Sequence, residues 1–379
     1  MTVRFLHTSD WQLGVTRHFL AAGPQDRWAA ARNEAVTALC KLAADEGCDF
    51  IVVAGDVFET NHVGRATVLT AIEALKGCRL PIFLLPGNHD CLEPTNVYGS
   101  LAWQRHKPAN VHVLAEPGQC VEVKPGVEVV GAPWLSKRPT ADLVAEAAKR
   151  LEPFPQGFRV LVGHGAVSTL SPDPDNPALI QIEAAQRALA EQRFHFLALG
   201  DRHSTTNVTG TPDSRIWYSG TPEAFDFVEV DNGNVLLVEA DDSGLRVTPK
   251  RVGTWKFVVQ DEQLNSQQDL DALVSAIDAI SNKSKTMLKL GLTGTLTMTQ
   301  KMALDQLLEH WGELFAAVVM SKSRSELVVA PSTEDFGQLQ LSGYGAKALE
   351  VLRGKLSGSE QEAAGDALAL LFRLQGGAA

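Results

Sequence analysis

The stretch PIFLLPGNHD, residues 81–90, decides the fold class of this 379-residue chain. Its first five residues predict a buried strand, and Gly-Asn-His-Asp follows almost at once. Glycine lets the backbone turn sharply and approach a bound ion, and the three polar residues offer oxygen and nitrogen donors. An apolar run that ends in such a loop is typical of an α/β sheet, where ligand sites lie beyond the carboxyl ends of the strands.

Four other apolar stretches end in the same kind of loop. Residues 3–7 lead to Asp10 and Gln12, residues 50–54 to Gly-Asp at 55–56, residues 159–162 to Gly-His at 163–164, and residues 196–199 to Gly-Asp-Arg-His at 200–203. The spacing of apolar residues predicts helices between them, at 28–46, 66–75, 141–150 and 180–190. Because strands and helices alternate, we expect the five loops to converge on one site.

The order of these motifs is itself informative. They read Asp-x-Gln, Gly-Asp-x-Phe-Glu, Gly-Asn-His-Asp, Gly-His and Gly-Asp-x-His. This order resembles the calcineurin-like metallophosphoesterase superfamily, whose pattern is DxH, GDxxx, GNHD, GH and GHxH. The stretches HTSDWQLG (7–14), VVAGDVFE (52–59), LPGNHD (85–90) and YSGTPEAFDF (218–227) look like the SbcD-type DNA-repair exonucleases. The resemblance implies a four-layer α-β-β-α sandwich with a smaller α+β capping domain.

The resemblance also implies a role for each polar residue. The matching metal ligands are Asp10, Asp56 and His203 for a first ion, and Asp56, Asn88 and His164 for a second. Asp56 would therefore bridge the two ions. Two such ions can clamp a phosphodiester and activate a water for in-line displacement. His89 matches the residue that protonates the leaving oxygen or stabilises the transition state.

Two positions depart from the superfamily pattern. Gln12 stands where histidine is usual, and Asp201 replaces the first histidine of GHxH. A glutamine carbonyl and a carboxylate can both coordinate, so we expect both residues to be ligands. These oxygen donors make the site harder, which favours Mn²⁺ or Mg²⁺ over Zn²⁺. A glutamine oxygen is a weaker donor than imidazole, so occupancy of the first metal site is left open.

Four more residues border the expected site. Arg202 lies between two expected ligands, where it either touches a phosphate or points into solvent. His62 follows the Gly-Asp-Val-Phe-Glu motif and either faces substrate or lies on the surface. For Trp11 and Phe58, we expect core packing rather than stacking on a nucleobase.

The sequence also predicts how the chain is divided into domains. We expect a metallophosphoesterase domain at 1–245, a capping domain at 246–330, and a linker with C-terminal helices at 331–379. Residues 330–338 contain Pro331 and Gly337 and predict the linker. Helices are predicted at 346–356 and 360–374, the second with an apolar stripe. This stripe either packs on its own domain or docks on a partner, which the resemblance identifies as an SbcC-like coiled-coil ATPase of the SMC type. The resemblance also implies a homodimer.

Composition limits the remaining possibilities. With 34 basic and 45 acidic residues, the net charge of −11 argues against a surface coated with DNA-binding positive charge, although a local basic groove remains possible. Five cysteines without a CxxC pair predict neither a disulfide framework nor a zinc ribbon, and fit a reducing cytoplasm. No apolar stretch approaches roughly 18 residues, so we expect no membrane span.

Three functions remain open. The first is an SbcD-like nuclease that cleaves DNA as a 3′–5′ exonuclease and as an endonuclease, in repair or in defence. The second is a phosphodiesterase acting on nucleotides or other small diesters. The third is a scaffold subunit whose metal site is weakened by Gln12 and Asp201. The unit after residue 245 and the long C-terminal segment favour the nuclease, because a small-molecule enzyme needs neither.

Overall fold

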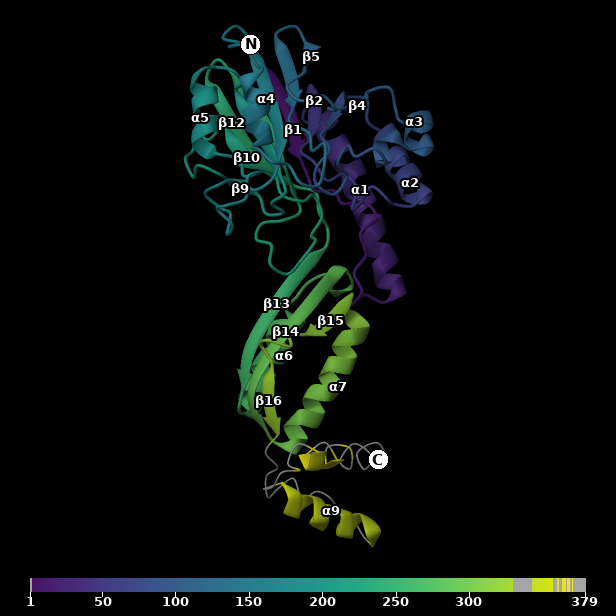
Figure 1. The fold of residues 1–379 in the computed structure, drawn as a ribbon. Helices are drawn as coiled ribbons and strands as arrows, with labels where there is room; N and C mark the ends of the chain where they lie inside the picture. Colours follow the sequence, from purple (N-terminus) through teal and green to yellow (C-terminus); the bar gives the residue numbers. More distant parts are fainter. Residues whose placement is uncertain are drawn as a thin grey trace. The chain divides into compact units, whose positions relative to one another are not determined.

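The computed structural model describes residues 2–329, 343–356, 360, 363–365, 367, 368 and 370. The chain divides into two units, the first ending at Trp255 and the second beginning at Lys256 (Figure 1). The boundary expected at 245/246 falls inside strand β12 (Gly244–Arg251), which pairs antiparallel with β11 (Asn234–Asp241). The first unit therefore continues beyond the expected boundary.

The first unit contains two six-stranded sheets. One has the order β12-β11-β1-β2-β3-β4, with β1 at Val3–Thr8, β2 at Phe50–Val53, β3 at Ile82–Leu84 and β4 at Val111–Val113. The other has the order β5-β6-β7-β8-β10-β9, at Cys120–Lys124, Val127–Gly131, Phe158–His164, Phe196–Gly200, Ile216–Tyr218 and Thr206–Asn207. Strands β1, β2 and β3 are parallel, as are β7 and β8, so the polar loops leave each sheet at one edge.

Three apolar clusters show that the layers lie in the order α-β-β-α. The inner cluster joins the facing sides of the two sheets and includes Phe5, Phe50 and Phe196. One outer cluster packs α1 (Ala22–Asp45), α2 (Arg65–Lys76) and α3 (Leu101–His106) on the first sheet. The other packs α4 (Leu143–Lys149) and α5 (Ile182–Ala190) on the second sheet. The expected four-layer fold is confirmed. A short 3₁₀ turn at Val97–Gly99 precedes α3.

Residues 227–230 form a loop, although the alternation Val-Glu-Val at 228–230 is typical of a strand. Val228 and Val230 are 82% and 74% exposed, whereas the side chain of Glu229 is 3% exposed. The two valines are exposed and the glutamate is buried, the reverse of what their polarity suggests, because the Glu229 carboxylate accepts hydrogen bonds from donors inside the protein.

The second unit is a sheet with helical connections. Its elements are β13 (Lys256–Leu264), α6 (Gln267–Asp278), a 3₁₀ turn (Lys283–Lys285), β14 (Thr286–Leu296), α7 (Met298–Leu314), β15 (Ala317–Met320) and β16 (Glu326–Val329). All its strand pairs are parallel, with β13 on one side of β14 and both β15 and β16 on the other. Thr297 caps α7 with a capping box, in which its side chain accepts a hydrogen bond from the Gln300 N–H.

The C-terminal region is described only in part. Helix α9 spans Tyr344–Lys355, close to the expected 346–356. Its Leu349 and Leu352 pack against a small cluster that includes Met298 and Leu368. Leu368 belongs to the expected helix at 360–374, so part of the apolar stripe of that helix packs within the second unit. The expected linker at 330–338 lies outside the described residues, as does much of the expected helix at 360–374. No helix in the described part of the chain is long and apolar enough to cross a membrane.

The half-buried histidine His195 makes the stability of the first unit depend on pH. Burial, with Arg215 and Arg159 nearby, lowers the pKa of His195 from 6.5 to about 4. The unfolded chain therefore takes up the proton first, and stability is lost as the pH falls from 6.5 towards 4. We expect His195→Asn, which retains an acceptor for the Arg159 N–H, to lose less stability than the parent between pH 7 and pH 5.

Urea unfolding at the two pH values measures this difference. The control is His106→Asn, because His106 is an exposed histidine of the same unit. This variant is expected to show the pH dependence of the parent. An equal loss of stability in the parent and in His195→Asn would contradict the assignment.

Candidate metal centre

The loops after β1 and β2 are joined by backbone hydrogen bonds that extend the sheet beyond its strands. The Asp10 N–H donates to the Gly55 carbonyl at 3.0 Å, and the Gln12 N–H donates to the Asp56 carbonyl at 2.9 Å. Three expected ligands are thus fixed relative to one another by main-chain contacts, which are less mobile than side-chain contacts.

Four expected ligands have left-handed backbone conformations. The φ angles are 53° at Asp10, 43° at Gln12, 53° at Asp56 and 98° at Asp201. Residues other than glycine rarely adopt such angles, and Asp tolerates them better than most. Strained backbone of this kind concentrates at functional sites, where the surrounding structure holds it in place.

Two glycines allow side chains of neighbouring loops to meet. A Cβ atom at Gly55 would lie 2.1 Å from His164 Nδ1, and one at Gly87 would lie 2.2 Å from Asp56 Oδ1. Either contact is far shorter than real Cβ atoms show. The glycine before the polar residue in these motifs is therefore required by the packing of ligands against its backbone.

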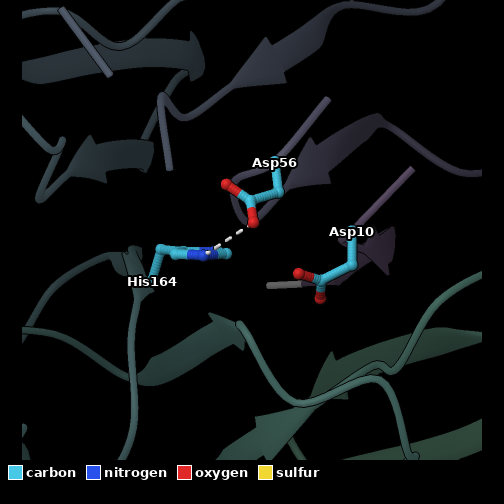
Figure 2. Close-up of side chains that lie close together, drawn as sticks. All are labelled: Asp10, Asp56 and His164. Atoms are coloured by element: carbon cyan, nitrogen blue, oxygen red, sulfur yellow. Dashed lines mark ion pairs between the residues drawn. The ribbon is translucent and has the colours of Figure 1, made fainter. Parts of the chain in front are cut away.

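Asp56, Asn88 and His164 form one half of the site. His164 Nε2 lies 3.4 Å from Asp56 Oδ2 and 2.7 Å from Asn88 Oδ1. His164 Nδ1 donates to the Ala54 carbonyl at 2.7 Å, and this bond directs Nε2 towards the carboxylates. Ligand atoms of Asp10, Asp56 and His164 all lie within 4.8 Å of one another (Figure 2).

Asp10, Gln12 and His203 form the other half. His203 Nε2 lies 4.0 Å from Asp10 Oδ1 and 3.4 Å from Gln12 Nε2. The Asp201 N–H lies 3.1 Å from both oxygens of the Asp10 carboxylate, and Asp201 Oδ1 lies 3.9 Å from His164 Nε2. All seven expected ligands are thus gathered at one edge of the first unit.

The electrostatics show an excess of buried negative charge. Burial raises the pKa of the Asp10 and Asp201 carboxyls. Burial alone would also raise the pKa of Asp56 and lower that of His164. Their attraction reverses both effects and leaves the pKa of Asp56 low and that of His164 well above its ordinary value. The cluster thus favours any added positive charge, whether a proton or a metal ion.

The donor set fits divalent cations. It combines carboxylate and amide oxygens with imidazole nitrogens, a mixture suited to Mn²⁺, Mg²⁺, Fe²⁺ or Zn²⁺. Gln12 Oε1 is buried and has no hydrogen-bond partner among the described residues, as expected of an oxygen that serves a cation. Divalent ions held here would polarise a phosphoryl group and lower the pKa of water.

His89 lies beside this cluster, and its backbone and ring are both held by hydrogen bonds. Its backbone N–H donates to Asp56 Oδ1 at 2.9 Å, and its Nδ1 donates to the Glu59 carbonyl at 2.7 Å. Nε2, 3.9 Å from Asp56 Oδ2, is the nitrogen left to face a substrate. The side chain of His89 is 37% exposed, so this nitrogen lies at the surface of the cluster.

Asp90, the last residue of the Gly-Asn-His-Asp motif, joins two loops. Its carboxylate accepts hydrogen bonds from the backbone N–H groups of Gly87 and Val57 at 2.8 and 2.9 Å, and from the Tyr98 hydroxyl at 2.6 Å. It makes no hydrogen bond to the His89 ring among the described residues, so it orients the loop rather than the imidazole.

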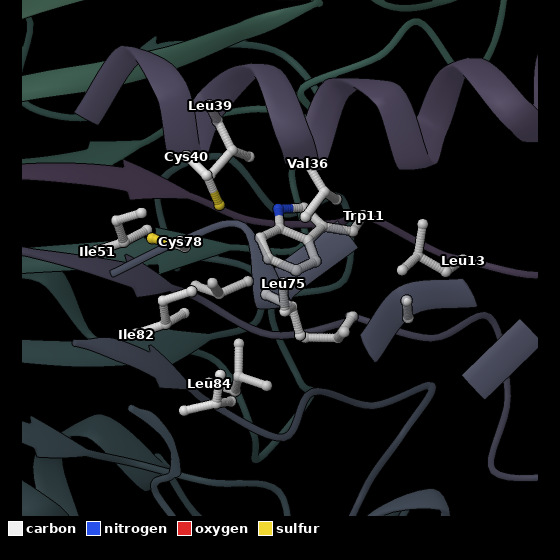
Figure 3. Close-up of a cluster of buried hydrophobic side chains, with 14 of the residues drawn as sticks. Trp11, Leu13, Val36, Leu39, Cys40, Ile51, Leu75, Cys78, Ile82 and Leu84 are labelled. Atoms are coloured by element: carbon white, nitrogen blue, oxygen red, sulfur yellow. The ribbon is translucent and has the colours of Figure 1, made fainter. Parts of the chain in front are cut away.

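The residues expected to border the site lie outside the cluster. Arg202 and His62 are exposed. Among the described contacts, Arg202 Nε donates to Thr206 Oγ1 at 2.9 Å. The side chains of Trp11 and Phe58 are buried, and Figure 3 shows Trp11 in the apolar cluster beneath α1. Their expected role in core packing agrees with this position.

Two residues that the sequence did not single out support the site from behind. Glu229 Oε1 accepts a hydrogen bond from His203 Nδ1 at 2.9 Å, which leaves Nε2 to face Asp10. The buried Arg32 donates to the carbonyls of Trp11 and Asp10 at 2.9 and 3.3 Å. Neither partner is close in sequence. For Glu229, the one hint in the sequence was a charged residue placed between two valines.

The Glu229–His203 contact generates a prediction about metal affinity. Glu229→Gln should retain the shape of the loop but hold His203 less firmly. Loss of such a supporting carboxylate typically weakens metal binding by about 10–100-fold. Calorimetric titration with Mn²⁺ should show this loss at one ion only. Glu191→Gln, which removes a carboxylate paired with Arg193 on the surface, should bind Mn²⁺ like the parent. Equal affinities for Glu229→Gln and the parent would contradict the assignment.

Comparison with known proteins gives distant structural matches and one family match. The structure of TT1561 from Thermus thermophilus matches 66% of this chain and 99% of its own, with 12% identity and a TM-score of 0.42. Purple acid phosphatase PPD1 from yellow lupin matches 66% and 52%, with 10% identity and a TM-score of 0.39. The calcineurin-like phosphoesterase family profile matches residues 3–238, more than half of the chain. The chain therefore belongs to the calcineurin-like phosphoesterase family of metal-dependent hydrolases that act on phosphoesters.

Proposed function

We propose that the chain is a DNA nuclease of the SbcD type, which hydrolyses phosphodiesters as a 3′–5′ exonuclease and as an endonuclease. Two divalent ions, most simply Mn²⁺, serve the reaction. The proposal rests on the gathering of the seven donors at one edge, together with the Ser-Gly-Thr-Pro-Glu segment at 219–223.

This segment contacts the first metal loop directly. Thr221 Oγ1 donates to the Asp10 carbonyl at 3.0 Å, and the hydroxyls of Ser219 and Ser9 lie 2.9 Å apart. Ser9 in turn donates to Asp10 Oδ2 at 2.6 Å. The stretch by which the sequence resembles SbcD-type nucleases thus supports a ligand, which favours a role in the same chemistry.

Different side chains of the chain would have different roles in hydrolysis. The carboxylates and imidazoles of the cluster would hold the ions, which when bound would supply positive charge to activate water and to neutralise the phosphoryl oxygens. His89, with Nδ1 fixed by the Glu59 carbonyl, offers Nε2 to the leaving oxygen. The buried Asp90 keeps the two loops that carry Asp56 and His89 together.

Three assays with Mn²⁺ distinguish this proposal from its alternatives. A nuclease cleaves single-stranded DNA and also bis-p-nitrophenyl phosphate. A phosphodiesterase for small diesters cleaves only the second substrate. A scaffold subunit cleaves neither. Failure to cleave DNA, with the small diester still cleaved, would replace the nuclease with the small-molecule enzyme.

His89 provides the sharpest mutational prediction. His89→Ala should bind Mn²⁺ like the parent, because no ligand is removed, but should cleave about 10²–10⁴-fold more slowly. The matched variant Asp56→Ala should lose both ions and all activity, because Asp56 would be a ligand of both ions. Titration with Mn²⁺ and single-turnover cleavage measure both effects. Parental cleavage by His89→Ala, or two ions bound by Asp56→Ala, would show that the roles are assigned wrongly.

We further propose that the C-terminal region binds an SbcC-like coiled-coil ATPase, and that the chain acts as a homodimer. Tyr344 and Val351 of α9 are exposed apolar side chains, a feature that supports docking on a partner. Deletion of the residues after Pro331 should abolish co-purification with the ATPase and leave cleavage of small diesters intact. Retained co-purification of the shortened chain would contradict the partner assignment.

A further inference from the structure

Two cysteines from different segments of the chain meet in the apolar cluster beneath α1. Cys40 lies on the buried face of α1, and Cys78 directly follows Gly77, the residue that caps the end of α2. Both belong to the outer cluster on the first sheet, and they are 5% and 6% exposed. Figure 3 shows both sulfur atoms in this cluster, with Ile51 and Ile82 of the sheet close by.

The two thiols are hydrogen-bonded to each other. The Cys40 thiol donates to Cys78 Sγ, and the Cys78 thiol donates in turn to the Leu80 carbonyl at 3.9 Å. The hydrogen bond from Cys40 lowers the pKa of the Cys78 thiol from 9.0 to about 7, against the effect of burial, and raises the pKa of Cys40. Cys78 is therefore the thiol that loses its proton first, and its sulfur is the nucleophile of the pair.

The other thiols of the first unit differ from this pair. Cys48 is also 6% exposed and belongs to the same cluster, but burial raises its pKa to about 12. Burial likewise raises the pKa of Cys91 and Cys120. A single buried cysteine behaves as a small apolar side chain. Two sulfurs in contact, one of them readily ionised, instead provide both reactants of disulfide formation.

The enclosure of the pair limits which oxidant can reach it. A bulky disulfide such as oxidised glutathione needs open access to the attacking sulfur, because exchange passes through a mixed disulfide. Hydrogen peroxide is close to water in size, and it leaves only one oxygen atom on the sulfur. A peroxide is therefore the class of oxidant that suits this pair.

We propose that Cys40 and Cys78 are a peroxide-sensitive pair, reduced in the resting protein, that closes to a reversible disulfide between α1 and the segment before β3. The Cys78 thiolate attacks a peroxide oxygen, the O–O bond breaks, and a sulfenic acid forms with release of hydroxide, which takes up the proton that Cys78 lost. The Cys40 thiol then attacks the oxidised sulfur, and water leaves as the S–S bond forms. Over both steps the two thiols lose two electrons and two protons, and one H₂O₂ becomes two waters. The inference does not depend on the proposed function, because no step uses the metal centre.

The bond would join two parts of the first unit that support the metal centre. Helix α1 carries Arg32, which donates to the Asp10 carbonyl, and β3 leads from the segment after Cys78 to the Gly-Asn-His-Asp loop. The crosslink would close a long loop, and this restricts the unfolded chain. Oxidation is thus expected to stabilise the first unit.

Peptide mapping of the full chain tests the pair directly. The protein is treated with H₂O₂ in EDTA and unfolded, free thiols are alkylated, and the unreduced digest is analysed by mass spectrometry. The parent should yield a peptide in which Cys40 is joined to Cys78, lighter by two hydrogen atoms than its two parts together. Dithiothreitol should restore both thiols. The oxidised parent should melt about 5 °C or more above the reduced parent.

Cys48→Ser is the matched control, because Cys48 is equally enclosed in the same cluster. This variant should form the crosslink and gain the same thermal stability on oxidation. Cys40→Ser should form no crosslink and should not melt higher after peroxide treatment. Because the crosslink is mapped on the parent, the decision does not require that either variant folds well.

Three results would overturn the proposal. The first is a parent in which peroxide leaves Cys40 and Cys78 as free thiols. The second is a parent in which Cys78 pairs with Cys48 as often as with Cys40. The third is an oxidised parent that melts no higher than the reduced parent, because the crosslink would then not tie α1 to the sheet.

Discussion

The site depends on how closely the ends of neighbouring strands approach one another. At Gly55, Gly87 and Gly200 an added Cβ atom would lie about 2 Å from a ligand side chain or from the Ala54 carbonyl. Even alanine at these positions would force the loops apart. The aspartates that follow two of these glycines, Asp56 and Asp201, adopt left-handed backbone angles. This strain is retained because main-chain hydrogen bonds between the loops hold the geometry in place.

The close approach of the loops buries carboxylates next to one another, and these carboxylates make the site suited to bind cations. Isolated carboxylates are costly to bury, yet Asp10 and Asp56 are almost fully enclosed. Backbone N–H groups of Asp201 and His89 and the imidazole of His164 offset part of that cost. Gln12 Oε1, which has no hydrogen-bond partner among the described residues, is one further oxygen that a cation could use. A cluster built in this way is suited to hold divalent ions next to a phosphoryl group.

The strands and the expected metal ligands could largely be predicted from sequence, because each is marked by residues that lie close together in the chain. The apolar run expected at 50–54 matches strand β2, and each expected ligand lies at a strand end or within four residues after one. The residues that support the ligands could not be found in this way. Glu229 meets His203 from 26 positions away, and Arg32 reaches Asp10 from 22. The Val-Glu-Val alternation at 228–230 misled because a glutamate with three internal donors can be buried in place of valines.

The central claim is that seven donors at one edge of the first unit hold two divalent ions that share Asp56. Anomalous diffraction at the manganese edge, on crystals of the full chain grown with Mn²⁺, tests it most directly. The account predicts two peaks roughly 3.5–4 Å apart, with Asp56 between them. One peak would lie towards His164 and Asn88, and the other towards Asp10 and His203. A single peak, or peaks away from Asp56, would contradict the account.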